Sequence, residues 1–209
     1  MHGRCIMPHG FCRKAALLKK APLVYRNAMS LAKTVTLVGM MGAGKTSIGK
    51  RLAVRLDVPF ADADHEIEEA AGMSVADIFA KYGEPEFRRL ERNVIARLLH
   101  DKILVLATGG GAWMDETTRA TMKSQAFSIW LRAPVDILLG RVRKRQEHEQ
   151  ARPLLNNGDM RGTLEKLLLA REPVYAMADM VLDSGDEPHG VLVDKIVAAL
   201  AAHKLCEEP

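Results

Sequence analysis

The sequence has 209 residues, of which 48% are hydrophobic and 27% are charged, a composition typical of one globular domain with enough length for a core. A second full-sized domain would not fit. The net charge of +4 points to nucleic acid only until it is divided along the chain. Residues 1–30 contain six lysines or arginines and no acid, which leaves 24 basic and 26 acidic residues in 31–209, a net charge of −2. The compact part is near neutral, and we expect no nucleic-acid partner.

Residues 1–30 form a basic extension that shows neither strand alternation nor a clear helical stripe. We expect this extension to be disordered and the folded domain to span 31–209. Two interpretations of the extension stay open. It is either an organelle-targeting segment or the product of an upstream start codon, with Met29 beginning the functional protein. We prefer the upstream start codon.

The cysteines and the hydropathy bear on the compartment. Cys5, Cys12 and Cys206 lie outside the expected core, which argues against a disulfide framework and fits a reducing compartment. His2 and His9 would complete a set of four zinc ligands with Cys5 and Cys12, but this spacing lacks the intervening structure of known zinc modules. No apolar run approaches the 18 or so residues of a membrane span. We expect a cytoplasmic protein without membrane contact.

Short apolar runs alternate with helical patterns along the rest of the chain, which predicts a parallel sheet with helices on both faces. Strands are expected at 34–38, 58–61, 103–107, 127–131 and 180–182. Helices are expected at 47–56, 65–71, 74–80, from 85 onward, 116–123, 134–144, 163–176 and 188–202. The pattern predicts a three-layer α/β fold with a five-stranded parallel sheet.

Residues 39–46, GMMGAGKT, match G-x-x-x-x-G-K-[ST] and lie directly between the first strand and a helix. Glycines in such a loop let the backbone turn successive N–H groups toward phosphates, and the helix presents its positive end to the same anion. Lys45 would neutralise the β- and γ-phosphates of ATP, and the Thr46 hydroxyl would bind Mg²⁺. The expected nucleotide contacts are Gly42, Ala43, Gly44, Lys45, Thr46 and Ser47. The alternative is an ordinary glycine-rich turn with an exposed lysine, but motif and context agree on a phosphate site.

Asp62 and Asp64 lie two residues apart where the second strand ends. If the extended geometry persists, both carboxylates point the same way, at the edge of the sheet where ligands bind. One would serve the metal through water while the other orients and deprotonates an alcohol. Alternatively, Asp64 is the N-cap of helix 65–71, a role compatible with catalysis.

Two arginines are candidate anion ligands. Arg88 is three residues from Glu91, and this pair either fixes the guanidinium in one direction or is an ordinary surface ion pair. Arg171 follows the apolar spacing of its helix, where a charged group needs a counter-charge, an exit to solvent or an anionic ligand. The other members of that stripe are Leu164, Leu167, Leu168 and Tyr175. Two planar guanidinium groups suit a substrate carboxylate.

A glycine-rich turn and a polar stretch complete the candidates. Gly109, Gly110 and Gly111 follow the strand at 103–107 and suit either a close approach to a ligand or a flexible turn. The polar, charged stretch at about 145–159 is expected to be a mobile lid. Arg152 on this lid would reach the transferring phosphoryl group, although most surface arginines have no such role.

Taken together, these segments resemble the shikimate kinase family from about residue 33 to the final helix. The matching pieces are GMMGAGKT at 39–46, DAD at 62–64, SVADIF at 74–79, EFRRLE at 86–91, TGGGA at 108–112, RPLL at 152–155 and AREPVY at 170–175. The resemblance implies a P-loop kinase fold similar to the nucleoside monophosphate kinases. It also implies ATP-dependent phosphorylation of the 3-hydroxyl of shikimate in the chorismate pathway, with Mg²⁺ as cofactor.

The resemblance implies a role for each matching residue. Asp64 would lie against the reacting hydroxyl, while Arg88 and Arg171 bind the carboxylate, so that the expected substrate contacts are Asp64, Arg88, Gly109, Gly110, Gly111 and Arg171. The expected catalytic residues are Asp64, Lys45 and Arg152, and the expected metal residues are Thr46 and Asp62. Glu91 would orient Arg88, and Arg152 would come from the lid to the phosphates. Whether Arg141 or Arg143 stacks on adenine stays open.

Other functions are weighed against this one. A gluconate kinase or a nucleoside monophosphate kinase is the nearest alternative, although a monophosphate acceptor would need more arginines than Arg88 and Arg171. A non-catalytic nucleotide-binding homologue is argued against by the complete set of expected catalytic and metal residues. A nucleic-acid or membrane-surface role would depend wholly on the basic extension. We expect a monomer whose partners are ATP and shikimate.

Overall fold

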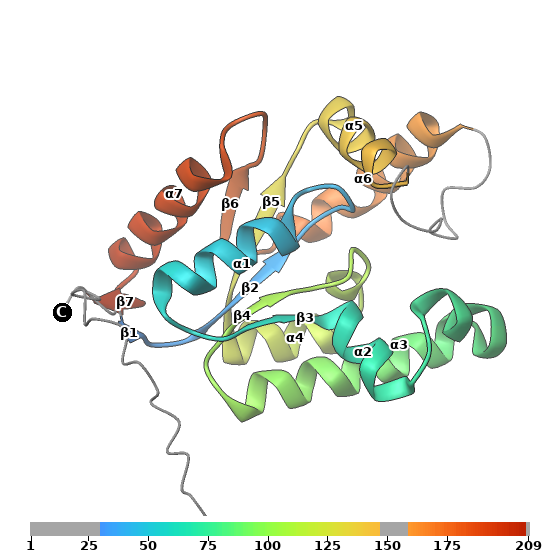
Figure 1. The fold of residues 1–209 in the computed structure, drawn as a ribbon, viewed down its shortest axis with the longest axis horizontal. Coiled ribbons are helices and arrows are strands. Elements are labelled where there is room, and N and C mark those ends of the chain that lie inside the picture. Colours follow the sequence, from blue (N-terminus) through green and yellow to red (C-terminus); the bar gives the residue numbers. More distant parts are fainter. Residues whose placement is uncertain (1–29, 147–158, 208–209) are drawn as a thin grey trace, which may run out of the picture.

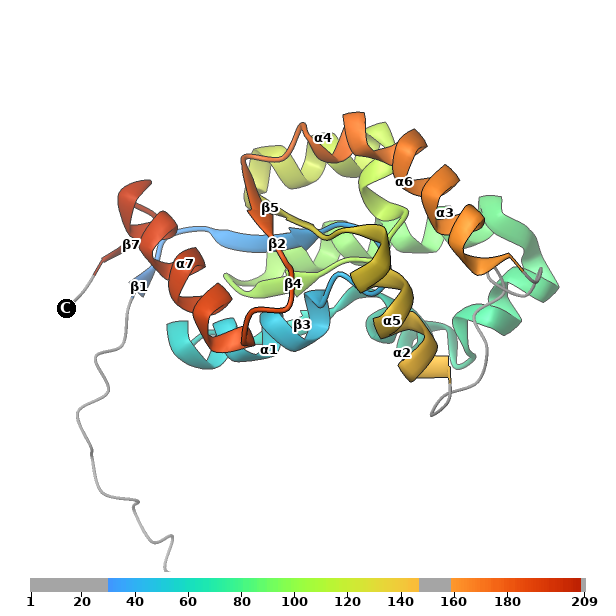
Figure 2. The ribbon, with the colours of Figure 1, turned by 90° about the horizontal axis from the view of Figure 1, so that it is seen from above.

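The computed structural model describes residues 30–146 and 159–207. A five-stranded parallel sheet forms the middle layer, in the order β3-β4-β2-β5-β6 (Figure 1). The strands are β2 (Thr34–Val38), β3 (Phe60–Asp62), β4 (Val105–Ala107), β5 (Ala126–Arg132) and β6 (Met180–Asp183). Figure 2 shows α4 and α6 on one side of the sheet and α1 and α7 on the other. The expected three-layer α/β fold is confirmed.

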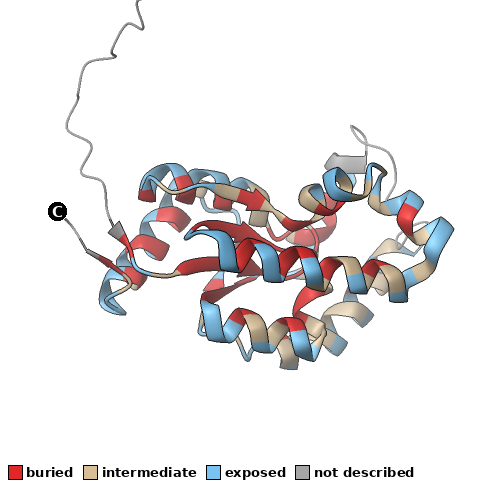
Figure 3. Ribbon diagram, turned by 90° about the horizontal axis from the view of Figure 1, so that it is seen from below, coloured by how far each residue is buried: buried red, intermediate tan, exposed pale blue. Residues whose placement is uncertain are grey.

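The centre of the sheet is buried on both faces. All five residues of β2 are buried, and the strand pairs with β4 through Val35↔Val105 and with β5 through Val35↔Phe127. A strand that is buried along its whole length, here with Thr34 and Thr36 between apolar residues, is typical of a parallel sheet covered by helices on both sides. Figure 3 shows the burial concentrated along these strands and on the inner faces of the helices.

The helices lie close to the expected positions. They are α1 (Lys45–Leu56), α2 (Ala63–Ala71), α3 (Val75–Asp101), α4 (Glu116–Gln125), α5 (Val135–Gln146), α6 (Met160–Tyr175) and α7 (His189–Ala202), with a short 3₁₀ helix, η1 (Ala112–Met114). In α1 the predicted apolar face of Ile48, Leu52 and Leu56 is fully buried against the sheet. This packing fixes the first turn of α1 directly beneath the glycine-rich loop.

Helix α3 contains a sharp break where the sequence predicts two separate helices. Gly83 has φ 78° and ψ 173°, a backbone conformation that non-glycine residues rarely adopt. Pro85 follows two residues later and suits a first helical turn, as expected. The second part buries Phe87, Val94 and Leu98. The break therefore turns the long second part of α3 back along the sheet.

A second, two-stranded sheet was not expected. β1 (Ser30–Leu31) pairs antiparallel with β7 (Cys206–Glu207) through Leu31↔Cys206. Both Leu31 and Cys206 are buried, so the expectation that Cys206 lies outside the core is wrong. Strands of two residues are too short to give a period in the sequence.

Several expectations concern residues outside the described ranges. They include the disordered extension up to residue 29, the four zinc candidates, and most of the lid with Arg152. Within 30–146 and 159–207, none of the helices has the length and apolarity to cross a membrane.

Candidate active site

The glycine-rich loop lies at the carboxyl end of the central strand, between β2 and α1. Gly39, Gly42 and Gly44 have φ of 135°, 81° and 93°, values that favour glycine. A Cβ atom on Gly39 would also lie 2.7 Å from the Leu131 carbonyl oxygen. Gly44 is the N-cap residue of α1, and because it has no side chain the first N–H groups of the helix remain available to an anion.

Lys45 reaches back across this loop. Its Nζ donates hydrogen bonds to the carbonyl oxygens of Gly39 at 2.8 Å and Met40 at 2.9 Å. The ammonium group is therefore held against the loop that would carry the phosphates, where it would neutralise their oxygens.

Thr46 and Asp62 form an oxygen pair beside the loop. The Thr46 hydroxyl donates to Asp62 Oδ2 at 2.7 Å, while Asp62 Oδ1 accepts the Asp64 N–H at 3.2 Å. Carboxylate and hydroxyl oxygens are the ligands that Mg²⁺ prefers, so the residues present fit this metal.

The hydrogen bond from the Asp64 N–H to the Asp62 carboxylate corrects two expectations about this acidic pair. Asp62, and not Asp64, is the N-cap residue of the helix, because α2 begins at Ala63. The extended backbone ends at Asp62, so strand alternation does not align the two carboxylates. Asp64 instead lies in the first turn of α2.

Asp64 meets Glu91 at the first glycine of the TGGGA turn. A Cβ atom on Gly109 would lie 2.7 Å from Asp64 Oδ1 and 2.9 Å from Glu91 Oε1. Only a residue without a side chain fits between these two carboxylates.

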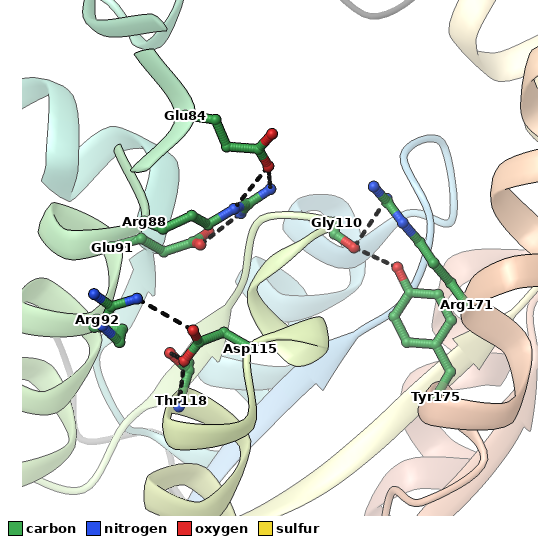
Figure 4. Close-up of polar contacts among 9 residues, drawn as sticks. All are labelled: Glu84, Arg88, Glu91, Arg92, Gly110, Asp115, Thr118, Arg171 and Tyr175. Carbon is green, nitrogen blue, oxygen red and sulfur yellow. Dashed lines mark hydrogen bonds and ion pairs between the residues drawn. The ribbon is translucent and has the colours of Figure 1, made fainter. Parts of the chain in front are cut away.

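Arg88 is held by two acids. Its Nη1 donates to Glu91 Oε2 at 2.6 Å, and its Nη2 donates to Glu84 Oε1 at 3.0 Å (Figure 4). The Glu91 side chain is 1% exposed, so the interpretation as a surface ion pair is wrong. Glu84 was missed, although an acid four residues before an arginine on a helix is a recognisable signal.

The electrostatics of the pair reflect its burial. Burial raises the pKa of Glu91 above its ordinary value, and the nearby Arg88 opposes that rise without cancelling it. Burial alone would lower the pKa of Arg88, but Glu91 and Glu84 outweigh it and raise that pKa. The guanidinium stays charged and fixed in direction.

Arg171 approaches from α6, on the other side of the glycine turn from Arg88 (Figure 4). Its Nη1 donates to the Gly110 carbonyl at 3.3 Å, and the Tyr175 hydroxyl donates to the same oxygen. Burial raises the pKa of Tyr175 to about 12, so the phenol remains a neutral donor at physiological pH. Arg171, the charged residue on the apolar stripe of α6, therefore faces the glycine turn.

Each glycine of the turn approaches one of the three expected substrate residues. Gly109 is next to Asp64, and a Cβ on Gly110 would lie 3.7 Å from Arg171 Nη1. A Cβ on Gly111 would lie 2.4 Å from Arg88 Nη2. The same position on Gly110 is 3.6 Å from the backbone nitrogen of Met41 in the phosphate loop. The turn therefore brings an acid, two arginines and the glycine-rich loop together within one small region, and in this structure its close contacts are with protein groups.

Arg141 and Arg143 differ in their surroundings. Arg143 is exposed, whereas Arg141 Nη1 donates to the Gly42 carbonyl at 3.4 Å and the Ser184 hydroxyl at 3.3 Å, and its Nη2 donates to the Gly185 carbonyl. Arg141 is thus the one of the two that contacts the phosphate loop. The sequence carried no signal for Ser184, a single serine after a strand.

Comparisons with known proteins agree on one family. A family model described as shikimate kinase matches residues 41–201. A shikimate kinase of Bradyrhizobium diazoefficiens is 51% identical over 177 residues, covering 85% of this chain and 83% of the relative. A shikimate kinase of Brucella canis is 50% identical over 172 residues, covering 82% of this chain and 84% of the relative. The solved structure of shikimate kinase from Acinetobacter baumannii in complex with shikimate is similar with a TM-score of 0.78 and 37% identity, covering 83% of this chain and 95% of that one.

Proposed function

This chain belongs to the shikimate kinase family, and on that premise we propose that it transfers the γ-phosphoryl group of ATP to the 3-hydroxyl of shikimate, giving shikimate 3-phosphate and ADP. The observation that carries the proposal is the meeting of Asp64, Arg88 and Arg171 at the Gly109–Gly111 turn beside the phosphate loop. An acid for a hydroxyl and two guanidinium groups for a carboxylate match the two ends of such an acceptor. The product would enter the synthesis of chorismate and the aromatic amino acids.

The arginines would set the orientation of the acceptor. Arg88 and Arg171 lie on opposite sides of the glycine turn, so a carboxylate between them would receive charge-assisted hydrogen bonds from both (Figure 4). Glu84 and Glu91 hold the Arg88 guanidinium in one direction before the substrate arrives. This order in the free protein lowers the entropy that binding costs.

Asp64 would orient the reacting hydroxyl and accept its proton as the oxygen attacks the γ-phosphorus. The bond between that phosphorus and the oxygen bridging to the β-phosphate breaks, and the electron pair leaves with ADP. Lys45 and the inward N–H groups of the loop would stabilise the charge on the transferring group. We also propose that Arg152, on the lid segment, contributes a further positive charge there, and that Arg141, not Arg143, is the arginine beside the adenine, because it contacts the Gly42 carbonyl.

The metal would be held by two residues already in contact. Thr46 and Asp62 would bind Mg²⁺, directly or through water, and the ion when bound neutralises phosphate charge. We also propose that the protein is a monomer and that it is located in the cytoplasm. Size-exclusion chromatography with light scattering tests the first, and fractionation of the source cells tests the second.

Measuring ADP release with shikimate, gluconate and nucleoside monophosphates in parallel tests the acceptor. We expect shikimate to be turned over at least about 100-fold more efficiently than the others, because its rigid ring holds the reacting hydroxyl at a fixed distance from the carboxylate, whereas gluconate is an open chain and a nucleoside monophosphate carries its anion on a much larger group. Faster turnover of gluconate or a monophosphate would overturn the proposed acceptor. No ADP release with any of them would indicate a nucleotide-binding homologue without catalysis.

A further inference from the structure

Ser184 contacts the backbone of the glycine-rich loop through the Ala43 carbonyl. It follows β6, at the start of the connection to α7, and is fully buried. Its hydroxyl donates a hydrogen bond of 2.9 Å to the carbonyl oxygen of Ala43, 141 residues earlier in the chain. Its own N–H donates to the Arg132 carbonyl at the end of β5, which fixes the serine to the sheet.

The direction of the Ser184 hydroxyl is determined by Arg141. A guanidinium can only donate, so the Ser184 oxygen accepts from Arg141 Nη1 at 3.3 Å. The hydroxyl proton is then free to go to Ala43, whose carbonyl can only accept. The two contacts therefore reinforce each other instead of competing.

The Ala43 carbonyl needs such a donor. A loop that turns its N–H groups toward phosphates turns its carbonyls outward, and Ala43 is 0% exposed, so water does not satisfy this oxygen. The loop also packs tightly on α5, since a Cβ atom on Gly42 would lie 3.0 Å from the Leu138 carbonyl oxygen. The outer side of the loop is thus a buried surface in which a protein donor must be provided.

A fixed carbonyl fixes the N–H on the other side of the same peptide. The bond between Ala43 and Gly44 is trans, like every peptide bond among the described residues, so its C=O and N–H point in opposite directions. Holding the Ala43 oxygen outward therefore holds the Gly44 N–H toward the inside of the loop. Gly44, at φ 93°, has the conformational freedom to let this peptide rotate if the tether is lost.

We propose that Ser184 is a positioning residue for the nucleotide, which holds the Ala43–Gly44 peptide in the orientation that binds phosphate. The inference rests on the proposed function only in taking a nucleoside triphosphate as the ligand of the loop, and it does not depend on the acceptor. Ser184 does not touch the phosphates itself. Its effect passes through one backbone hydrogen bond.

The experiment measures the affinity for ADP by isothermal titration calorimetry, with no acceptor present, together with the KM values for ATP and shikimate. For Ser184→Ala we expect ADP affinity to fall about 5- to 30-fold, the equivalent of one buried hydrogen bond, with a parallel rise in the KM for ATP. The KM for shikimate should change less than about twofold. Ser184→Thr keeps the hydroxyl and should restore ADP affinity, whereas Ser124→Ala, on the exposed side of α4, should change nothing.

Three results would overturn the proposal. They are unchanged ADP affinity in folded Ser184→Ala, equal rises in both KM values, and no recovery in Ser184→Thr. If Ser184→Ala does not fold, Ser184→Cys replaces it, since its weaker S–H donor should give an intermediate loss of ADP affinity, and wild-type affinity there would equally contradict the role. Failure of the enzyme to phosphorylate shikimate would leave the ADP measurements intact, so the two proposals fail separately.

Discussion

The Thr46 hydroxyl and the Asp62 carboxylate are joined by a hydrogen bond of 2.7 Å, which links the first turn of α1 to the end of β3. The phosphate loop and the edge strand of the sheet are thereby connected at the point where the metal of a bound nucleotide would lie. Asp62 is also the N-cap of α2, the helix that carries Asp64. One carboxylate would therefore couple the proposed metal site to the residue expected to face the acceptor.

Replacing Asp62 by asparagine should separate its two roles. Asparagine caps a helix about as well as aspartate, so the melting temperature should change little. The loss of negative charge should raise the Mg²⁺ concentration for half-maximal turnover by roughly 10- to 100-fold. A Mg²⁺ titration at fixed ATP measures this, with Asp77→Asn, in the first turn of α3, as the control. Unchanged Mg²⁺ dependence would exclude Asp62 from the metal site.

Asp64→Asn should lower kcat by ~10²–10⁴ because the amide cannot accept the hydroxyl proton. The amide has nearly the same shape, so the KM values for ATP and shikimate should stay within a few-fold of wild type. Steady-state kinetics with each substrate varied in turn gives all three constants. A variant that turns over at nearly the wild-type rate would refute Asp64 as the base.

The fold could be predicted largely from periodicity, because the apolar strands and the face of Ile48, Leu52 and Leu56 repeat over several residues. The motif also placed the glycine-rich loop correctly between strand and helix. The features that were missed depend on single contacts between distant residues. The β1–β7 pair, the start of α2 one residue after Asp62, and the hydrogen bond from Ser184 to Ala43 leave no repeating pattern to detect.

Arg171→Lys keeps the positive charge of this side chain and removes its planar donor pair. We expect the KM for shikimate to rise about tenfold or more, with little change in the KM for ATP, because a carboxylate loses paired donors that an ammonium cannot replace. Arg161→Lys on the same helix is the matched control, since its ion pairs are exposed. Equal rises in both KM values would argue against recognition of the carboxylate by Arg171.

Gly111→Ala tests the close approach of the turn to Arg88. The backbone of Gly111, at φ −102° and ψ −13°, accepts alanine, but the new Cβ would lie 2.4 Å from Arg88 Nη2. The guanidinium must move, so the KM for shikimate should rise several-fold while the melting temperature falls only slightly. Gly140→Ala is the control, because nothing beyond its chain neighbours and the local backbone of α5 lies within 4 Å of its Cβ position, and it should stabilise the fold by roughly 0.5–1 kcal/mol. An unchanged KM in Gly111→Ala would mean that Arg88 is not constrained by the turn.

Glu91 should give the fold a pH dependence of definite sign. Among the described residues its Oε1 is buried with no hydrogen-bond partner, and burial raises its pKa above the ordinary 4.5, with Asp64 and Asp115 adding to the rise and Arg88 opposing it. The folded state then binds this proton more tightly than the unfolded chain. Its contribution to stability is therefore lost as pH rises from 4.5 through the raised pKa.

Glu91→Gln removes this titration and keeps the shape of the side chain. The free energy of unfolding of the wild type minus that of the variant should fall as pH rises across this window, then level off above the raised pKa. Urea unfolding of both proteins in steps from pH 4.5 upward measures the difference, and subtraction cancels the shared groups that do not interact with Glu91. A difference that rises with pH would mean that Arg88 outweighs burial and that the pKa of Glu91 is lowered in the folded protein.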